Sequence, residues 1–175
     1  MLSGNINYTT IIIITTTDTA ITIRFKTKDS GGWARIFDFG NGEYSNNIIF
    51  TINRNNEKKI GYQTYSPDLI TLKEGFINLD VNDDVWRHLA WTISTDGTWK
   101  FYINGALYQT DVSKSVPNNV YRKDAWIGKS AWRDPPYNGF IDDFRIYKTA
   151  LDATDVMNLY QDDGIRLGNS DNIIN

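Results

Sequence analysis

The feature that most constrains the fold of this chain is the alternation of apolar and polar side chains with a period of two residues. In the segment 20–28, apolar residues at 21, 23 and 25 alternate with polar or charged residues at 22, 24 and 26. Successive side chains of a strand point to opposite faces, so this pattern predicts a strand with one buried and one wet face. The same pattern predicts further strands at Tyr8–Thr15, Arg35–Phe39, Asn47–Ile52, Lys59–Tyr65, Phe76–Leu79, Arg87–Ser94, Trp99–Ile103, Ala106–Gln109, Ala125–Lys129 and Gly139–Tyr147.

Short turn signals separate these strands. Asp96-Gly97 joins the predicted strands Arg87–Ser94 and Trp99–Ile103. Asn104-Gly105 then joins Trp99–Ile103 to Ala106–Gln109, as a two-residue hairpin turn whose residues tolerate positive φ. Many short strands joined by tight turns favour a sandwich or barrel over an α/β sheet. We therefore expect an all-β fold, a two-sheet antiparallel β-sandwich.

One helix is predicted near the C-terminus, at Ala153–Tyr160. Asp152 can cap its first amides, and Asp155 sits near its positive end. Leu151 and Val156 occupy the two positions of a hydrophobic staple. We expect a short helix packed on the edge of the sandwich.

Length and composition narrow the class of protein. The 175 residues fit one domain, expected at 1–160, followed by a polar tail or linker at 161–175. There is no cysteine, so disulfides and thiolate metal sites are excluded. The net charge of −3 comes without a basic block, which argues against nucleic-acid binding. The longest apolar run, Ile11–Ile14, is too short to span a bilayer, and no signal peptide is visible.

Several motifs resemble those of laminin-G-like, concanavalin-A-like jelly rolls. They are VWRHLAWT at 85–92 with DGTWKFYING at 96–105, YNGFIDDFRIY at 137–147, WIGKS at 126–130 and RIFDFG at 35–40. The resemblance runs from about Leu2 to Tyr160. It implies two stacked antiparallel sheets in a module that binds glycans or proteins outside cells, often as part of a larger adhesin, hydrolase or viral surface protein.

An enzyme is not expected. Some relatives in this superfamily are retaining glucanases, which need two carboxyl groups about 5–5.5 Å apart. The three glutamates Glu43, Glu57 and Glu74 are expected in loops, and none begins a Glu-x-Asp run that would place two carboxylates on one face. The sole histidine, His88, has no sequence cue for a nucleophile beside it, so we expect a structural role.

The tryptophans suggest where a ligand would bind. Trp86, Trp91, Trp99 and Trp126 lie on family strands and are expected to fill the core or brace hairpins. Trp132 instead lies in a polar, proline-stiffened loop, where it is either an exposed platform or a loop anchor. This loop and the Asn41–Asn47 loop are expected to face each other. The candidate ligand-binding residues are Asn46, Asn47, Lys129, Trp132, Arg133, Asp134 and Tyr137.

Calcium is a candidate cofactor, because the loops are rich in hard oxygen ligands. Related pentraxins place a calcium-dependent site where the two loops meet, but this chain has amides at Asn46 and Asn47 and a lysine after Gly128. A second candidate, also implied by the resemblance, is a structural ion between Asp142 and Asn5. The alternative for Asp142 is a carboxylate that accepts hydrogen bonds from backbone amides.

The leading hypothesis is a non-catalytic, lectin-like carbohydrate-binding module of a surface or secreted protein. Its partner would be a glycan or glycoprotein, with no nucleic acid and no membrane insertion. The alternative is a structural or adhesion domain, on a virion or cell surface, without a sugar site. A polar rim around an aromatic anchor would suit either function.

Overall fold

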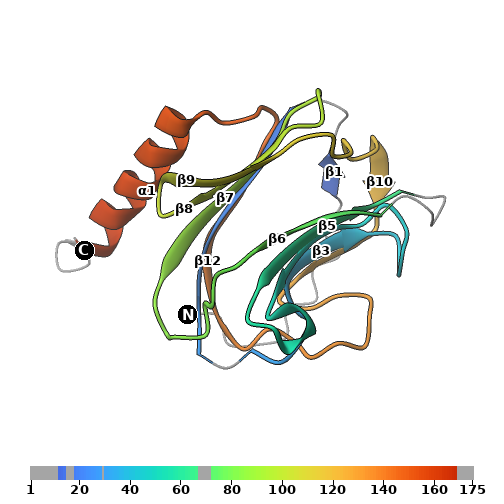
Figure 1. Cartoon of the computed structure of the whole chain (residues 1–175), viewed down its shortest axis with the longest axis horizontal. Coiled ribbons are helices and arrows are strands. Elements are labelled where there is room, and N and C mark those ends of the chain that lie inside the picture. The colour runs from blue at the N-terminus through green and yellow to red at the C-terminus, as the bar shows by residue number, and fades with distance from the viewer. Residues whose placement is uncertain (1–11, 15–17, 29, 67–71, 169–175) are drawn as a thin grey trace, which may run out of the picture.

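Two five-stranded antiparallel sheets stack face to face in the computed structural model, which describes residues 12–14, 18–28, 30–66 and 72–168 (Figure 1). Sheet I has the order β12-β2-β7-β8-β9 and sheet II the order β11-β3-β4-β5-β6, while β1 and β10 form a separate pair. The strands are β1 Ile12–Ile14, β2 Thr19–Thr27, β3 Ala34–Gly40, β4 Ile48–Ile52, β5 Ile60–Tyr65, β6 Leu72–Ile77, β7 Arg87–Ile93, β8 Trp99–Ile103, β9 Ala106–Asp111, β10 Val120–Arg122, β11 Asp124–Ile127 and β12 Gly139–Tyr147. The predicted all-β sandwich is confirmed.

The core lies between the sheets and is built from the apolar phase of the alternating strands. In sheet I, Leu89 pairs with Ile103, and Trp91 with Phe101, all facing inward. Phe37, Phe39 and Phe50 of sheet II lie opposite them. The ring centroid of Phe37 lies 5.0 Å from that of Phe39 and 5.8 Å from that of Phe50. Burial of this contiguous apolar surface is the main stabilising term of the fold.

Both predicted hairpins are present. Asp96 Oδ1 accepts the amide of Thr98 across the β7–β8 turn, at 2.8 Å. Asn104 and Gly105 have φ values of 50° and 81°, which is the left-handed pair that a two-residue turn requires. The strand boundaries differ more. β6 begins at Leu72 and ends at Ile77, earlier than the predicted 76–79, and much of the predicted strand 8–15 lies outside the described residues.

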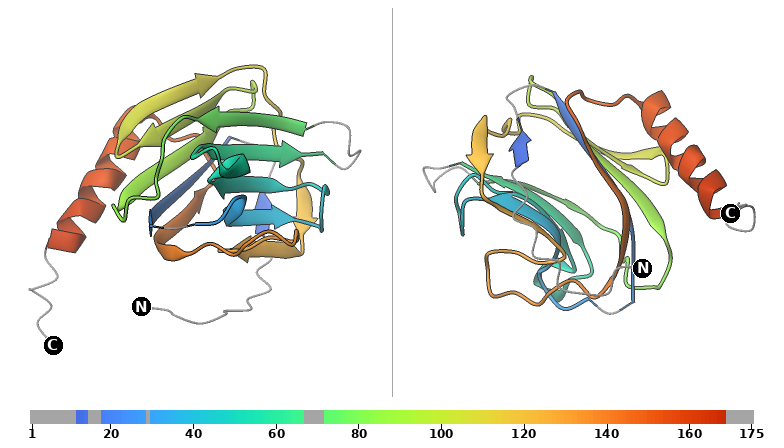
Figure 2. Two further views of the ribbon diagram at one scale, coloured as in Figure 1. Left: turned by 60° about the horizontal axis from the view of Figure 1, so that its bottom comes forward. Right: turned by 180° about the vertical axis from the view of Figure 1, so that it is seen from behind.

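Helix α1, Ala153–Gly168, covers the outer face of sheet I (Figure 2). Asp155 N donates to Asp152 Oδ1 at 2.8 Å and Asp152 N donates to Asp155 Oδ2 at 3.1 Å, so the predicted cap is a reciprocal capping box. Leu151 and Val156 pack on Ala20, Ala90 and Tyr102 of the sheet. The predicted end at Tyr160 is wrong. The helix runs to Gly168, past Gly164, although a glycine in a helix interior costs about 1 kcal/mol relative to alanine.

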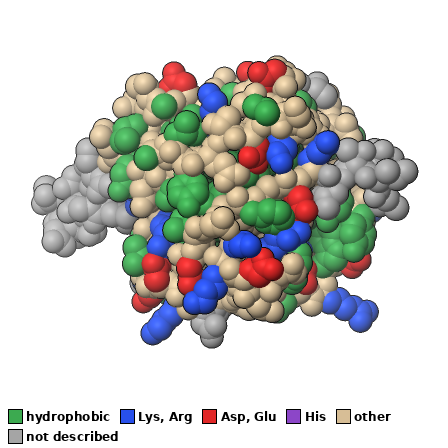
Figure 3. Space-filling model, in the orientation of Figure 1, with side chains coloured by type: hydrophobic (Ala, Val, Ile, Leu, Met, Phe, Trp, Pro, Cys, Tyr) green, Lys and Arg blue, Asp and Glu red, His purple; other side chains and the backbone are tan. Residues whose placement is uncertain are grey.

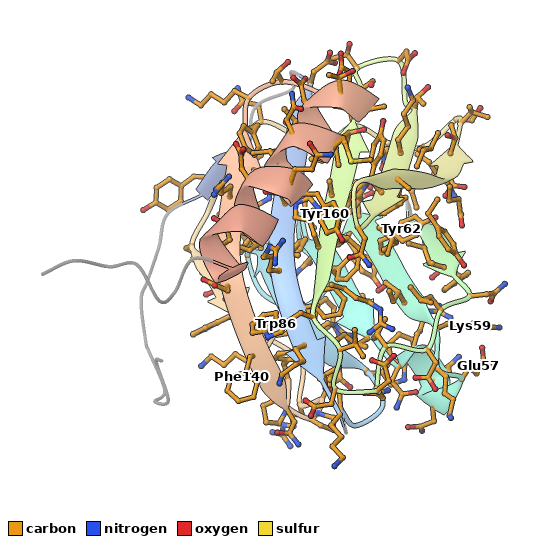
Figure 4. The ribbon with its side chains drawn as sticks, turned by 90° about the vertical axis from the view of Figure 1, so that its left-hand side faces the viewer. Glu57, Lys59, Tyr62, Trp86, Phe140 and Tyr160 are labelled. Atoms are coloured by element: carbon orange, nitrogen blue, oxygen red, sulfur yellow. The ribbon has the colours of Figure 1, made fainter. Side chains whose placement is uncertain are left out.

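The strand tryptophans divide into two groups. Trp91 and Trp99 are fully buried in the core, as predicted. Trp86 is 36% exposed and lies beside the exposed Phe140 on the outer side of sheet I, near α1 (Figure 4). Trp126 is half-buried in the edge strand β11, on the outward phase shared with Asp38. The prediction of core burial was therefore wrong for Trp86 and Trp126, since an edge or pre-strand position leaves one side of the ring uncovered.

His88 is buried beneath α1, in line with a structural role. Its ring centroid lies 6.0 Å from that of Tyr160, and Arg24 beside it donates to the Tyr160 carbonyl at 3.3 Å. Burial, with a further contribution from Arg24, lowers the pKa of His88 to about 4. The histidine is therefore neutral at physiological pH. Within the described residues, no helix is both long and apolar enough to cross a bilayer.

A β-bulge in β3 sets the side chains of sheet II. Arg35 pairs with Thr51 and Phe37 with Phe50, so Ile36 is an extra residue without a partner in β4. The extra residue shifts the alternation by one position. Arg35 and Asp38, three residues apart, consequently both point to the outer face of sheet II.

Candidate ligand-binding face

The outer face of sheet II carries a continuous series of aromatic rings and guanidinium groups. Each member lies within 6 Å of the next, measured between ring centroids or from a centroid to a guanidinium carbon. We call this series the aromatic–arginine ladder. Its residues, from one end of the sheet to the other, are Tyr44, Tyr65, Trp132, Arg35, Trp33, Arg54 and Phe76.

The rings of Tyr44, Tyr65 and Trp132 form one end of the ladder, beside the Asn41–Asn47 loop, which we call the upper end. Trp132 lies edge-on to Tyr44, with centroids 5.3 Å apart, and is tilted against Tyr65 at 5.9 Å. Tyr44 and Tyr65 are themselves edge-on at 5.5 Å. Tyr44 is 46% exposed, and the other two rings are half-buried. The structure thus brings Trp132 to Tyr44, at the centre of the Asn41–Asn47 loop, and leaves aromatic surface open to solvent.

The loop that carries Trp132 is fixed to sheet II at several points. Gly128 N donates to the carbonyl of the bulged Ile36 at 2.8 Å, where the loop leaves β11. The amide of Ala131 donates to Asp38 Oδ2 at 3.3 Å. Asp134 forms an ion pair with Arg35 at 3.0 Å. A loop held at both ends and in the middle loses little further conformational entropy when a ligand binds.

Asp38 is the buried carboxyl group of this face. Its burial raises its pKa to about 6, although hydrogen bonds from Asn47 Nδ2 and Ala131 N lower it in part. Asp38 is only 1% exposed. It therefore positions the two loops and does not reach a ligand.

The two predicted asparagines are buried, at 8% and 1% exposure. Asn46 Oδ1 accepts from Asn118, and the Asn46 carbonyl accepts from the buried Arg122 at 2.8 Å. The Asn47 amide donates to Asp38 at 2.9 Å and its oxygen accepts from Ser45 N at 2.6 Å. Asn46 and Asn47 therefore hold the Asn41–Asn47 loop in shape. The prediction that Asn46 and Asn47 face a ligand is revised, because both side chains are buried and hydrogen-bonded to other groups of the protein.

The other predicted residues lie around Trp132 in different roles. Tyr137 turns inward, and its hydroxyl donates to the Lys26 carbonyl at 2.8 Å, so it anchors the loop to sheet I. Lys129 lies over the ring of Trp126, with Nζ 3.7 Å from the centroid. Arg133 is exposed beside Trp132. Of the predicted residues, Trp132, Arg133 and the partly exposed Asp134 are those that a ligand on this face would meet.

Sequence reasoning missed the lower end of the ladder, which consists of Trp33, Arg54 and Phe76. They come from the turn before β3, the short 3-10 turn Arg54–Asn56 and β6. The outward phase of Phe76, opposite to that of the buried Ile77, was a usable signal. Trp33 and Arg54 lie in turns, where no periodicity indicates which way a side chain points.

The calcium predictions rest on few groups. Asn5 lies outside the described residues, and Asp142 is exposed, with its Oδ1 accepting the amide of Asp143 at 2.8 Å. In the described parts of the chain, no three acidic, histidine or cysteine side chains converge. A calcium ion prefers six to eight oxygen ligands, which can include amide and carbonyl oxygens, and calcium binding stays a prediction.

Two stacked antiparallel sheets, with a helix over one and a series of aromatic rings on the outer face of the other, define the chain as a jelly-roll β-sandwich. The chain belongs to the concanavalin A-like lectin/glucanases superfamily, since the family model Laminin_G_3 matches residues 3–157. No curated protein sequence matches significantly.

Solved structures with the same fold include two carbohydrate-binding domains. Domain 4 of AbnA, an extracellular GH43 arabinanase of Geobacillus stearothermophilus in complex with arabinotriose, has a TM-score of 0.63 and 23% identity, over 83% of this chain and 67% of that one. The CBM40 of the Ruminococcus gnavus IT-sialidase, bound to α2,3-sialyllactose, has a TM-score of 0.69 and 16% identity, over 82% of both chains.

A third similar structure is the receptor-binding domain of botulinum neurotoxin mosaic serotype C/D. Its TM-score is 0.63 at 19% identity, over 83% of this chain and 36% of that one. This chain thus spans just over a third of the toxin domain. At these identities the likeness concerns the fold.

Proposed function

We propose that this chain is a non-catalytic carbohydrate-binding module of a surface or secreted protein, and that its glycan binds on the outer face of sheet II. The observation that carries the proposal is the cluster of Tyr44, Tyr65 and Trp132, whose rings remain partly exposed although the loops around them are tightly fixed.

The chemistry of the cluster suits a sugar. The C–H faces of a pyranose or furanose ring are apolar and pack on aromatic rings, while its hydroxyl groups need hydrogen-bonding partners at the rim. Arg133 and Asp134 flank Trp132 and can supply such partners. In each T-shaped contact only one of the two rings turns its face to its partner, so part of the aromatic face surface stays uncovered.

The carboxylates of this face support a binding role over hydrolysis. Glu74 accepts from Arg54 at 2.7 Å and from Gln63 at 3.0 Å. Asp134 is paired with Arg35, and Asp38 is buried under the loop. Retaining hydrolysis needs two carboxyl groups that converge on one glycosidic bond. Each of these three is already engaged in the structure of the face itself.

A glycan array with the purified domain tests the proposal, followed by titration of any hit. We expect Trp132→Ala to abolish measurable binding, since few other contacts would remain in a small, shallow site. Trp86→Ala is the matched control, because Trp86 is an exposed tryptophan on the opposite sheet. Equal loss in both variants, or a Trp132→Ala protein that unfolds early, would assign Trp132 to the fold instead.

Adhesion through protein contacts is the second candidate function. It is favoured by Trp86 and Phe140, whose rings lie 6.4 Å apart on the outer side of sheet I with Lys26 Nζ 5.2 Å from the Phe140 centroid. Exposed aromatic pairs of this kind are enriched in protein interfaces. An array without any glycan hit would favour this function over sugar binding.

A further inference from the structure

The lower end of the ladder is an aromatic pair held by one arginine. The guanidinium carbon of Arg54 lies 4.2 Å from the ring centroid of Phe76 and 4.8 Å from that of Trp33. Both distances are within the range of cation–π attraction. A Cβ at Gly61 would come within 2.8 Å of Arg54 Cδ, so the glycine lets the arginine lie flat on sheet II. The two rings are half-buried and thus retain exposed surface.

One side chain joins the two ends of the ladder. The guanidinium carbon of Arg35 lies 5.3 Å from the Trp33 centroid and 5.7 Å from the Trp132 centroid. Since Arg35 is only 5% exposed, it supports both rings from below. The centroids of the two tryptophans therefore lie no more than about 11 Å apart, around a single buried group.

The backbone at both ends of the ladder is strained. Trp33 has a φ of 65° and Tyr44 a φ of 58°, in the left-handed region that bulky side chains avoid. Neither residue is in the core. Backbone strain of this kind persists where the surrounding structure enforces it, and it is concentrated at ligand-binding sites. One such residue therefore lies at each end of the ladder.

The charges of the ladder are internally balanced. Arg54 pairs with Glu74 at 2.7 Å, and Arg35 pairs with Asp134 at 3.0 Å. A charged ligand that drew one partner out of such a pair would leave the other charge buried and unpaired, which costs free energy. On the side of the molecule seen in Figure 1, acidic and basic side chains are likewise mixed, without a block of one sign (Figure 3). The ladder is thus suited to a hydroxyl-rich, uncharged ligand.

We infer that Trp33, Arg54 and Phe76 form a second subsite for the ligand of the Trp132 cluster, so that the face takes a neutral oligosaccharide spanning both clusters. This inference rests on the proposed function. It adds that a single terminal sugar fills only half of the face, and that the arginines act as supports for the rings.

The test uses neutral oligosaccharides of graded length, with arabino-, xylo-, cello- and malto-series from one to six units and sialyllactose as the acidic probe. Isothermal titration should give an affinity that rises by about tenfold or more between the shortest binding sugar and the longer members of a series. Trp33→Ala should remove about tenfold in affinity for the long ligands and leave the short ones within about twofold. Trp132→Ala should abolish binding of both.

Phe76→Ala is the second variant, because it removes a ring of the same subsite from a different element. Unfolding temperatures of both variants, compared with that of Trp86→Ala, separate lost binding from lost folding. Equal affinity for short and long sugars, or no effect of either variant on the long ones, would overturn the second subsite while sugar binding stands. Preference for sialyllactose over every neutral sugar would overturn the neutral ligand. Absence of all glycan binding would overturn the proposed function itself.

Discussion

Arg35 and Asp134 form an ion pair that ties β3 to the loop carrying Trp132, with Nη2 and Oδ2 3.0 Å apart and the arginine side chain only 5% exposed. Burial lowers the pKa of Arg35, and Asp134 is the largest opposing influence. Asp134 therefore supplies the counter-charge for a buried guanidinium group.

Asp134→Asn should reduce the free energy of unfolding by about 2 kcal/mol, because it leaves a buried guanidinium without its counter-charge, while the partial exposure of Asp134 moderates the loss. Glycan affinity should fall as well, since the loop would position Trp132 less firmly. Asp83→Asn is the control, because Asp83 forms an exposed ion pair with Arg87 at 2.6 Å and should cost less than about 1 kcal/mol. Similar losses in urea denaturation for the two variants would contradict this view of the buried pair.

The buried Asp38 makes a defined contribution to the pH dependence of stability. Its pKa is raised to about 6 in the folded state from an ordinary value of 3.8, so the folded protein binds its proton more tightly than the unfolded chain. The stabilisation from protonation is present at low pH and is lost as the pH rises through about 6.

Relative to Asp38→Asn, the unaltered protein should thus gain about 1 kcal/mol of unfolding free energy between pH 7 and pH 5. The difference between the two proteins, followed by urea denaturation at several pH values, isolates this group from other titrating residues. A difference that is constant over this range would show that burial does not raise the pKa of Asp38.

Loss of the capping box of α1 should lower the stability of the protein by a moderate amount. Asp152→Ala should cost about 1 kcal/mol, because it removes the acceptor of the Asp155 amide. Asp162→Ala, an exposed position in the same helix, should change the unfolding free energy by less than about 0.5 kcal/mol. Thermal unfolding followed by circular dichroism measures both. An equal effect at the two positions would point to helix charge as the cause in place of the cap.

Gly75 is a site where one methyl group should be poorly tolerated. A Cβ there would lie 2.2 Å from the ring of Tyr62, which is fully buried and whose hydroxyl donates to Asp111 at 2.6 Å. Gly75→Ala should therefore cost about 2 kcal/mol or more through overpacking. The Gly75→Ala, Tyr62→Phe double variant keeps the crowding, and it should remain destabilised. Near-normal unfolding of Gly75→Ala would mean that β6 shifts freely.

The sequence was sufficient for those features that depend on local chemistry. Alternation placed Leu89 and Trp91 in the core, turn residues located the hairpin at Asn104-Gly105, and a cap located the start of α1. The end of α1 was not recoverable, since its last two turns carry polar residues and a glycine that resemble a tail. A local sequence pattern thus identified the start of α1 by its cap, whereas it did not identify where the helix ends.

The ladder depends on contacts between distant segments, and this limited what could be predicted. Trp132 was identified because it lies in a polar loop. Trp33 and Arg54 come from two other loops and meet only after the strands have paired, so no spacing along the chain links them. Asn46 was expected to face a ligand because it lies in the Asn41–Asn47 loop, yet its side chain is buried and accepts a hydrogen bond from Asn118, a residue of a distant segment.

The bulge at Ile36 links the outer face of sheet II to the loop that carries Trp132. If β3 kept all its residues but paired regularly with β4, Arg35 would share the inward phase of Phe37 and lose its contacts with both tryptophans. Deletion of Ile36 would instead keep Arg35 next to Phe37 and outward, but it would remove the Ile36 carbonyl that accepts the amide of Gly128 at 2.8 Å. One extra residue in β3 therefore provides the attachment point of the loop that lies over this strand.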